Sequence, residues 1–127
     1  MIVVDASVAI AFLDSSDPHH RDAVKLIAES ADSLWMHPLT IAEVLVHPTR
    51  VGRGEQAWAD LVAMGVKVDP TPVDPHRLAE IRVVSGCKMP DCCVLVSASN
   101  LAGNVLTFDA KLAAAAQRMV AKSADRR

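Results

Sequence analysis

The sequence predicts an α/β fold, a three-layer α/β/α sandwich around a mostly parallel sheet of four to five strands. Short apolar runs alternate with longer amphipathic segments along the chain, as in folds whose helices connect parallel strands. The first run, Ile2-Val3-Val4, is apolar at every position, which is typical of a strand buried on both faces. The 127 residues are enough for a single domain with a buried core.

The first part of the chain predicts one strand and two helices. Asp5 ends the strand of residues 2–4, and apolar side chains at helical spacing predict a short helix over residues 6–13. A second helix, residues 18–30, is indicated by Asp17, a capping residue followed by proline at the first helical position. Both helices have an apolar face that can pack on the sheet.

The middle of the chain predicts a second strand and two further helices. We expect the strand at residues 34–37, followed by a helix that begins at Pro38 and that Pro48 ends or kinks. After a loop with two glycines, residues 55–64 form the next helix, and Gly65 terminates it.

The remaining predicted strands are residues 66–68 and 105–107. The first of these alternates apolar and polar side chains, which indicates an edge strand. Between them we expect a helix capped by Asp74 that ends at Gly86, and a helix from Pro90-Asp91 to Gly103. A last helix begins at Asp109, and residues 119–127 are expected to form a frayed tail or a weak fifth strand.

Composition narrows the functional classes. No apolar run reaches the ~18 residues of a membrane span, and the N-terminus lacks the basic region of a secretory signal. The three cysteines, Cys87, Cys92 and Cys93, form neither a disulfide framework nor a zinc motif, so we expect buried thiols in a cytoplasmic protein. The net charge of −2 argues against binding nucleic acid by bulk charge alone, and 3% aromatic residues are too few for a base-stacking platform. Any contact with RNA would therefore run through phosphates and metal ions.

Four acidic residues are expected to meet at one edge of the sheet. Asp5 directly follows the first strand, Glu43 lies in the second turn of the helix after the second strand, and Asp109 follows the fourth. Asp91 begins the helix that leads into the fourth strand. In parallel α/β sheets, strand ends and the starts of the following helices share the edge where ligands bind. The four carboxylates converge there if the first, second and fourth strands lie in the middle of the sheet.

Each acid also has a simpler interpretation. Asp91 and Asp109 could be helix caps, and Glu43 could be a solvated helix residue. Asp5 is harder to explain this way, because aspartate is uncommon at strand ends without a capping or ligand role. Clustered carboxylates repel and raise one another's pKa, and a hard divalent cation such as Mg²⁺ or Mn²⁺ removes that penalty. We therefore favour a metal site over four independent explanations.

The sequence resembles the PIN domain family and, within it, the VapC toxins of bacterial toxin–antitoxin pairs. The resemblance extends over nearly the whole chain and depends on four segments in order, Ile2-Val3-Val4-Asp5-Ala6-Ser7, Ile41-Ala42-Glu43-Val44-Leu45, Met89-Pro90-Asp91 and Leu106-Thr107-Phe108-Asp109. It implies that the four acids bind metal and that the hydroxyls of Ser7 and Thr107 orient carboxylates or a water. It also implies that the third strand is at the sheet edge, which sets aside Asp69 and Asp74.

The resemblance implies the toxin of a type II toxin–antitoxin system, a metal-dependent endoribonuclease whose ion binds the phosphate and activates water. Arg50, Arg53 and Lys88 are candidate phosphate contacts.

A Mg²⁺-dependent phosphohydrolase or a phosphotransfer domain of similar architecture is the alternative. A phosphohydrolase of this kind requires a second aspartate at the position of Ser7. A phosphotransfer domain requires a lysine after a late strand, and Lys111 is not well placed for that role. An apolar content of 51% also suggests shared surfaces, by resemblance a homodimer contact and a groove for a helical VapB-type antitoxin.

Overall fold

The computed structural model describes the backbone of residues 1–125 and the side chains of residues 1–120. It contains four strands, β1 (Ile2–Val4), β2 (Leu34–Met36), β3 (Val66–Val68) and β4 (Asn104–Leu106). All neighbouring strands pair in parallel, in the order β3-β2-β1-β4. The predicted edge position of β3 is confirmed. Strands β2, β1 and β4 are adjacent. We had expected β4 to be one of the middle strands, but in the described sheet it is an edge strand.

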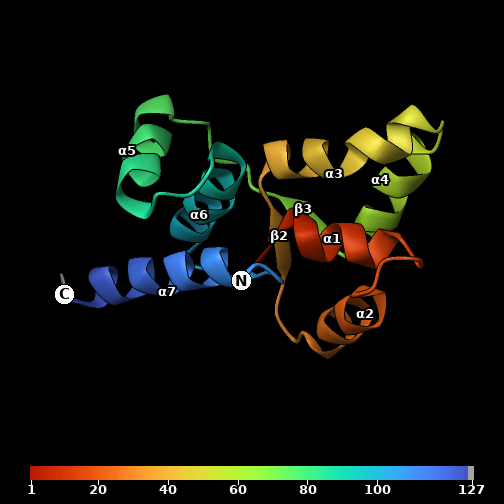
Figure 1. Cartoon of the computed structure of the whole chain (residues 1–127), viewed down its shortest axis with the longest axis horizontal. Helices are drawn as coiled ribbons and strands as arrows, with labels where there is room; N and C mark the ends of the chain where they lie inside the picture. Colours follow the sequence, from red (N-terminus) through yellow and green to blue (C-terminus); the bar gives the residue numbers. More distant parts are fainter. Residues whose placement is uncertain (126–127) are drawn as a thin grey trace.

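Seven helices surround the sheet in the described residues (Figure 1). They are α1 (Ala6–Leu13), α2 (His20–Glu29), α3 (Pro38–Arg50), α4 (Gly54–Ala63), α5 (Pro75–Ser85), α6 (Met89–Leu101) and α7 (Ala110–Asp125). One core cluster joins the sheet to α1, α2, α3 and α4, and another joins it to α5, α6 and α7. The predicted three-layer α/β/α architecture is therefore confirmed.

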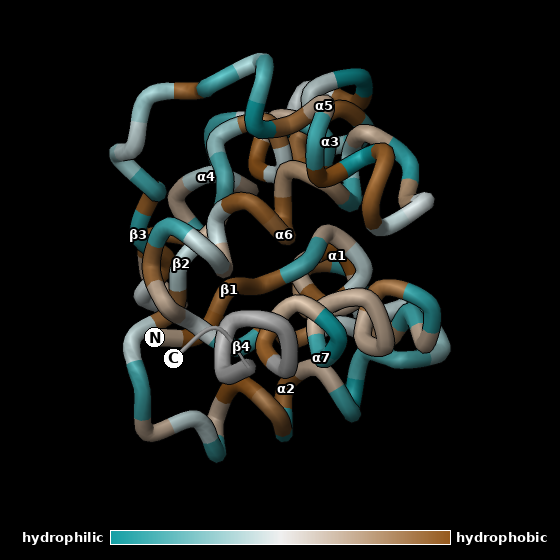
Figure 2. The backbone as a smooth tube through the Cα atoms, turned by 90° about the vertical axis from the view of Figure 1, so that its left-hand side faces the viewer, coloured by the Kyte–Doolittle hydropathy of each residue, from teal (hydrophilic) through white to brown (hydrophobic). Residues whose placement is uncertain are grey.

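The central strand β1 serves both cores because alternate residues of a strand point to opposite faces. Val3 belongs to the α5–α7 core and Val4 to the α1–α4 core, and both are fully buried. Figure 2 shows β1 as a hydrophobic segment in the middle of the molecule. On α6, six consecutive residues from Cys92 to Ser97 are buried, since this helix contacts β1, β4 and the neighbouring helices α3, α5 and α7. The cysteines are buried and free, as predicted.

Among helices α1 to α6, three boundaries differ from the sequence prediction by more than one residue. Helix α2 begins at His20 and not at Pro18, because the carboxylate of Asp17 accepts the N–H of His19 in a separate turn (2.8 Å). Helix α3 continues through Pro48 to Arg50, since the proline falls in the last turn, where the loss of one hydrogen bond costs little.

The third difference is at the end of α6, which finishes at Leu101 with Ala102 as its left-handed cap (φ 50°). We had expected Gly103 to end this helix. The glycine is required for a different reason, because a Cβ at residue 103 would lie 2.9 Å from the carbonyl oxygen of Met1. Chain packing, not helix termination, explains the glycine.

The expected fifth strand or frayed tail at residues 119–127 is wrong as far as Asp125, because α7 continues to that residue. Residues 126 and 127 lie outside the described part. Apolar side chains at helical spacing hold α7 on the core: Leu112, Ala115, Ala116 and Met119. In the described residues, no helix has the length and apolar character needed to cross a membrane.

Candidate active site

Asp5 lies at the centre of the polar edge of the sheet. Its backbone N–H donates to the carbonyl oxygen of Leu106 (3.0 Å), and its side chain is buried. The carboxylate oxygen Oδ2 accepts hydrogen bonds from the hydroxyls of Ser7 and Thr107, each at 2.8 Å. Although Asp5 precedes α1, its side chain makes no capping hydrogen bond. Capping therefore does not explain this aspartate.

Ser7 and Thr107 connect β1 to the segment after β4. The Ser7 hydroxyl accepts the backbone N–H of Phe108 (3.1 Å), and the Thr107 hydroxyl accepts the backbone N–H of Asp109 (2.9 Å). Each hydroxyl thus donates to Asp5 and accepts from the backbone, which fixes the direction of its proton. The Asp5 carboxylate is therefore held in one orientation by two segments that are 100 residues apart in sequence.

Asp91 lies in the first turn of α6, but the residue at the N-cap position is Lys88, so the capping interpretation fails for Asp91. Its pKa is raised by burial and by the charges of Asp5 and Asp109, while Lys111 and Lys88 act in the opposite direction. Asp109 does cap α7, since its Oδ1 accepts the N–H groups of Lys111 (2.9 Å) and Leu112 (3.2 Å).

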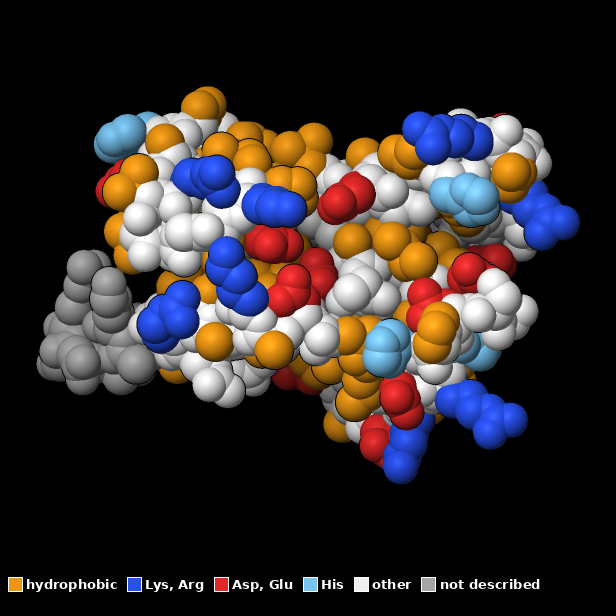
Figure 3. Space-filling view, in the orientation of Figure 1, with side chains coloured by type: hydrophobic (Ala, Val, Ile, Leu, Met, Phe, Trp, Pro, Cys, Tyr) orange, Lys and Arg blue, Asp and Glu red, His pale blue; other side chains and the backbone are white. Residues whose placement is uncertain are grey.

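Glu43 completes the cluster from α3. The residue is exposed, yet the protein packed around it raises the pKa of its carboxyl, and the charges of Asp5 and Asp91 raise it further. All four predicted acids are therefore electrostatic neighbours. Figure 3 shows acidic side chains gathered in the middle of one face of the molecule.

The donor set suits a hard divalent cation. Carboxylate oxygens are the ligands that Mg²⁺ and Mn²⁺ prefer. The pKa values of Glu43 and Asp91 are raised first by burial and then by neighbouring acidic charges, and a cation relieves that repulsion. Within the described residues, no three acids, histidines or cysteines are close enough to enclose an ion. That openness is compatible with Mg²⁺, which is commonly bound by one or two carboxylates together with waters and substrate phosphates.

We expect Asp91→Asn to raise the melting temperature of the metal-free protein at pH 7. A carboxyl whose pKa is raised by folding imposes no penalty below the ordinary value of 3.8, where the folded and unfolded states are both protonated. The folded state loses stability as pH rises through the raised pKa. Thermal melts in EDTA across pH check this, and the advantage of the variant should vanish below about pH 3.8. Equal melting temperatures at pH 7 would contradict the electrostatic coupling.

Asp69, at the end of β3, belongs to a separate buried network. Its carboxylate accepts the N–H of Thr71 (2.9 Å), the hydroxyl of Ser97 (2.7 Å) and the amide of Asn100 (3.3 Å). Burial alone raises a carboxyl pKa, but these hydrogen bonds outweigh it and lower the pKa of Asp69. This acid is stabilised as an anion without any cation, which is the opposite of Asp91.

Asp69→Asn should therefore lower the free energy of unfolding by about 1–3 kcal/mol at pH 7, because an amide N–H₂ cannot accept from Ser97 and Asn100. The lowered pKa means that this contribution is present above pH 3.8 and is lost as pH falls. Urea denaturation measures it, with the exposed cap variant Asp74→Asn as control. RNA cleavage by folded Asp69→Asn should stay within a few-fold of the parent, and unchanged stability would refute the network.

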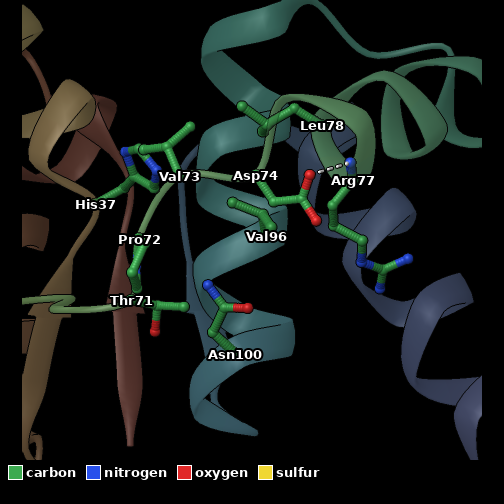
Figure 4. Close-up of a pocket in the computed structure, with 9 residues that line it drawn as sticks. All are labelled: His37, Thr71, Pro72, Val73, Asp74, Arg77, Leu78, Val96 and Asn100. Carbon is green, nitrogen blue, oxygen red and sulfur yellow. Dashed lines mark hydrogen bonds between the residues drawn. The ribbon is translucent and has the colours of Figure 1, made fainter.

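The structure also contains a pocket of about 390 Å³ beside this network, lined by residues from α5, α6 and the ends of β2 and β3 (Figure 4). None of the four clustered acids lines it. Several polar groups there are already engaged. Asp74 caps α5 by accepting the N–H of Arg77 (3.3 Å), and Nδ1 of the buried His37 accepts the N–H of Leu39 (3.1 Å). Burial lowers the pKa of His37, against the charge of Asp69, so this histidine is neutral at pH 7.

The candidate phosphate contacts are spread over two regions. Lys88 lies beside Asp91, whose pKa it lowers. Arg50 is 7 residues beyond Glu43 on α3, about 10 Å along the helix, and Arg53 is the N-cap residue of α4. Sequence reasoning missed Lys111 as a member of the site. Its position two residues after Asp109 at a helix start was the available signal.

Comparison with known proteins identifies one family and two solved structures of similar fold. A model of the PIN domain family matches residues 2–118. The structure is similar to that of VapC20 from Mycobacterium tuberculosis, a toxin that cleaves the sarcin-ricin loop, with a TM-score of 0.73 and 18% identity over 91% of this chain and 95% of that one. It is also similar to PAE2754 from Pyrobaculum aerophilum, with a TM-score of 0.63 and 22% identity over 98% of this chain and 95% of that one. A search of curated proteins finds no significant match.

Proposed function

Because this chain belongs to the PIN domain family, we propose that it is an endoribonuclease that hydrolyses RNA phosphodiester bonds with Mg²⁺ or Mn²⁺. The observation that carries the proposal is the coupling of Asp5, Glu43, Asp91 and Asp109 at one sheet edge. Asp5 is held by two hydroxyls, and two of its neighbours have raised pKa values. Without a cation, the neighbouring negative charges repel one another and destabilise the folded state. With a cation, the same carboxylates can serve as its ligands.

Each residue has a distinct part in this proposal. Asp5 is the oriented ligand, and Ser7 and Thr107 are positioning residues that fix its carboxylate. Asp91 and Glu43 supply the carboxylates whose ionised form gains most from a bound cation. When bound, the cation supplies charge neutralisation for the phosphodiester and acidity for an attacking water. No protein nucleophile is needed.

Cleavage of total RNA by the purified protein in Mn²⁺ tests this activity, against phosphate release from a small phosphate ester. Cut RNA without phosphate release supports the ribonuclease. Phosphate release without RNA cleavage would favour the phosphohydrolase or phosphotransfer alternative, which shares this sheet architecture.

We further propose that the protein is the toxin of a type II toxin–antitoxin pair, acting in the cytoplasm as a homodimer controlled by a VapB-type antitoxin. Support comes from the likeness to VapC20 and from large apolar side chains left exposed on helices. Val83 and Val84 on α5 are 83% and 64% exposed, and Leu39 on α3 is 54% exposed. Apolar surface of this kind commonly marks a contact with another chain.

Induced expression without a partner should arrest growth of the host, and co-expression with the antitoxin should restore it. The purified protein should elute as a dimer at micromolar concentration. Asp91→Asn serves as the harmless control, because it removes the proposed activity and leaves the apolar surfaces intact. Harmless expression of a strictly monomeric parent would contradict this role.

A further inference from the structure

Three basic side chains meet at one short loop beside the acidic cluster. The Arg82 guanidinium, from α5, donates to the carbonyl oxygen of Cys87. Lys111, at the start of α7, places its Nζ 3.5 Å from the carbonyl oxygen of Gly86. Lys88 is the next residue of the same loop and precedes α6. Figure 3 shows basic side chains along one side of the central acidic group.

The residues next to Asp5 and Asp109 have a different character. Asp5 is bordered by Ser7, and Phe108 packs on the α1–α4 core and stacks with His19 at 4.9 Å between ring centroids. These neighbours carry hydroxyl and aromatic groups, not the fixed positive charges found around residues 86–88. A polyanion that reaches the acids is therefore attracted by the positive charges around residues 86–88.

We propose that Lys88 and Lys111 bind backbone phosphates of single-stranded RNA next to the scissile phosphate, so that the strand crosses the 86–88 loop. This rests on the ribonuclease function proposed above. Lysine suits the task because its ammonium group contacts phosphate as a compact, mobile point charge. Lys111 Nζ makes only a long hydrogen bond to Gly86, so it can turn to a phosphate. Arg82 is held by Cys87 and shapes the loop.

A purely structural role is the competing explanation, since both lysines also reduce the repulsion felt by Asp91. The two roles differ in what they change. Phosphate contacts set the salt dependence of the reaction with RNA, because each contact releases counterions. Relief of repulsion changes stability and metal affinity and leaves that salt dependence untouched.

The test measures cleavage of an unstructured fluorescent RNA by Lys88→Gln, Lys111→Gln and the double variant, over a range of salt concentrations in Mn²⁺. We expect the slope of log(kcat/KM) against log salt to fall by about 0.7 for each lysine removed, mainly through KM. Lys88→Arg and Lys111→Arg should restore the slope. Lys25→Gln, with the same charge loss at an exposed position on α2, should match the parent.

Parent-like slopes in both lysine variants, or altered melting temperatures alone, would overturn the proposal while leaving the ribonuclease intact. The same holds if Arg50→Gln and Arg53→Gln flatten the slope instead, because the RNA would then cross the α3–α4 end. A parent protein that does not cut RNA overturns the proposed function itself, and this inference with it.

Discussion

Asp5→Asn, Asp91→Asn and Asp109→Asn should each lower RNA cleavage by orders of magnitude. Each substitution keeps the size of the side chain and removes the charge of one proposed ligand. Asparagine caps helices as well as aspartate does, so the loss in Asp109→Asn cannot be attributed to the end of α7. Pairs of these variants should be little worse than single variants, because one missing ligand already disables the unit. Initial cleavage rates in saturating Mn²⁺ provide the measurement.

Glu43→Gln is the most stringent test of the proposed site in this series. Glu43 is exposed, and its link to the cluster is the effect of the Asp5 and Asp91 charges on its pKa. Its expected loss of cleavage is also large. Asp74→Asn is the matched control, an exposed acid whose carboxylate caps α5 (3.0 Å to the N–H of His76). If Glu43→Gln cuts RNA like the parent while Asp74→Asn is inactive, the proposed site is wrong.

Saturating Mn²⁺ or Mg²⁺ should raise the melting temperature by about 10 °C. A ligand at a hundred times its Kd stabilises the folded state by about 2.7 kcal/mol, and in a domain of this size each kcal/mol shifts the midpoint by about 4 °C. Relief of the repulsion between Asp5, Asp91 and Glu43 is the physical source. Differential scanning fluorimetry with and without the ion measures the shift.

The same ion should be required for cleavage, so excess EDTA should abolish it and added Mn²⁺ should restore it. Asp91→Asn provides the matched control, because its melting temperature should respond far less to the ion. Undiminished cleavage in EDTA would exclude the metal mechanism, whatever the melting temperatures show.

Much of the fold could be predicted from the sequence because its signals are local. Apolar strands, proline at helix starts and Gly86 after α5 are short-range features, and each agrees with the structure apart from Pro18, which precedes α2. The errors concern choices between competing local hydrogen bonds. Asp17 could cap a helix or close a turn, and it closes a turn. Ala102 adopts the left-handed conformation that glycine usually supplies, whereas Gly103 is needed for the close approach to Met1.

The candidate site was predictable only as a set of residues. Parallel topology places strand ends at one edge, so the four acids could be named. Their different roles could not. Only the structure distinguishes Asp109, which caps a helix, from Asp91, which does not. Lys111, at the start of another helix, lowers the pKa of Asp91, and only its position two residues after Asp109 could have indicated this from the sequence.

The position of β1 has a consequence for biosynthesis. This strand is made before the other three, yet it pairs with β4, which lies about a hundred residues later in the chain. Many contacts of the central strand are therefore non-local and slow to form. Chains emerge from the ribosome N-terminus first, at about 5–20 residues per second. Several seconds therefore pass between the synthesis of Asp5 and the synthesis of Thr107 and Asp109. A nascent chain that stops before β4 lacks Thr107 and Asp109, so the activity proposed here would arise only after both residues have been made.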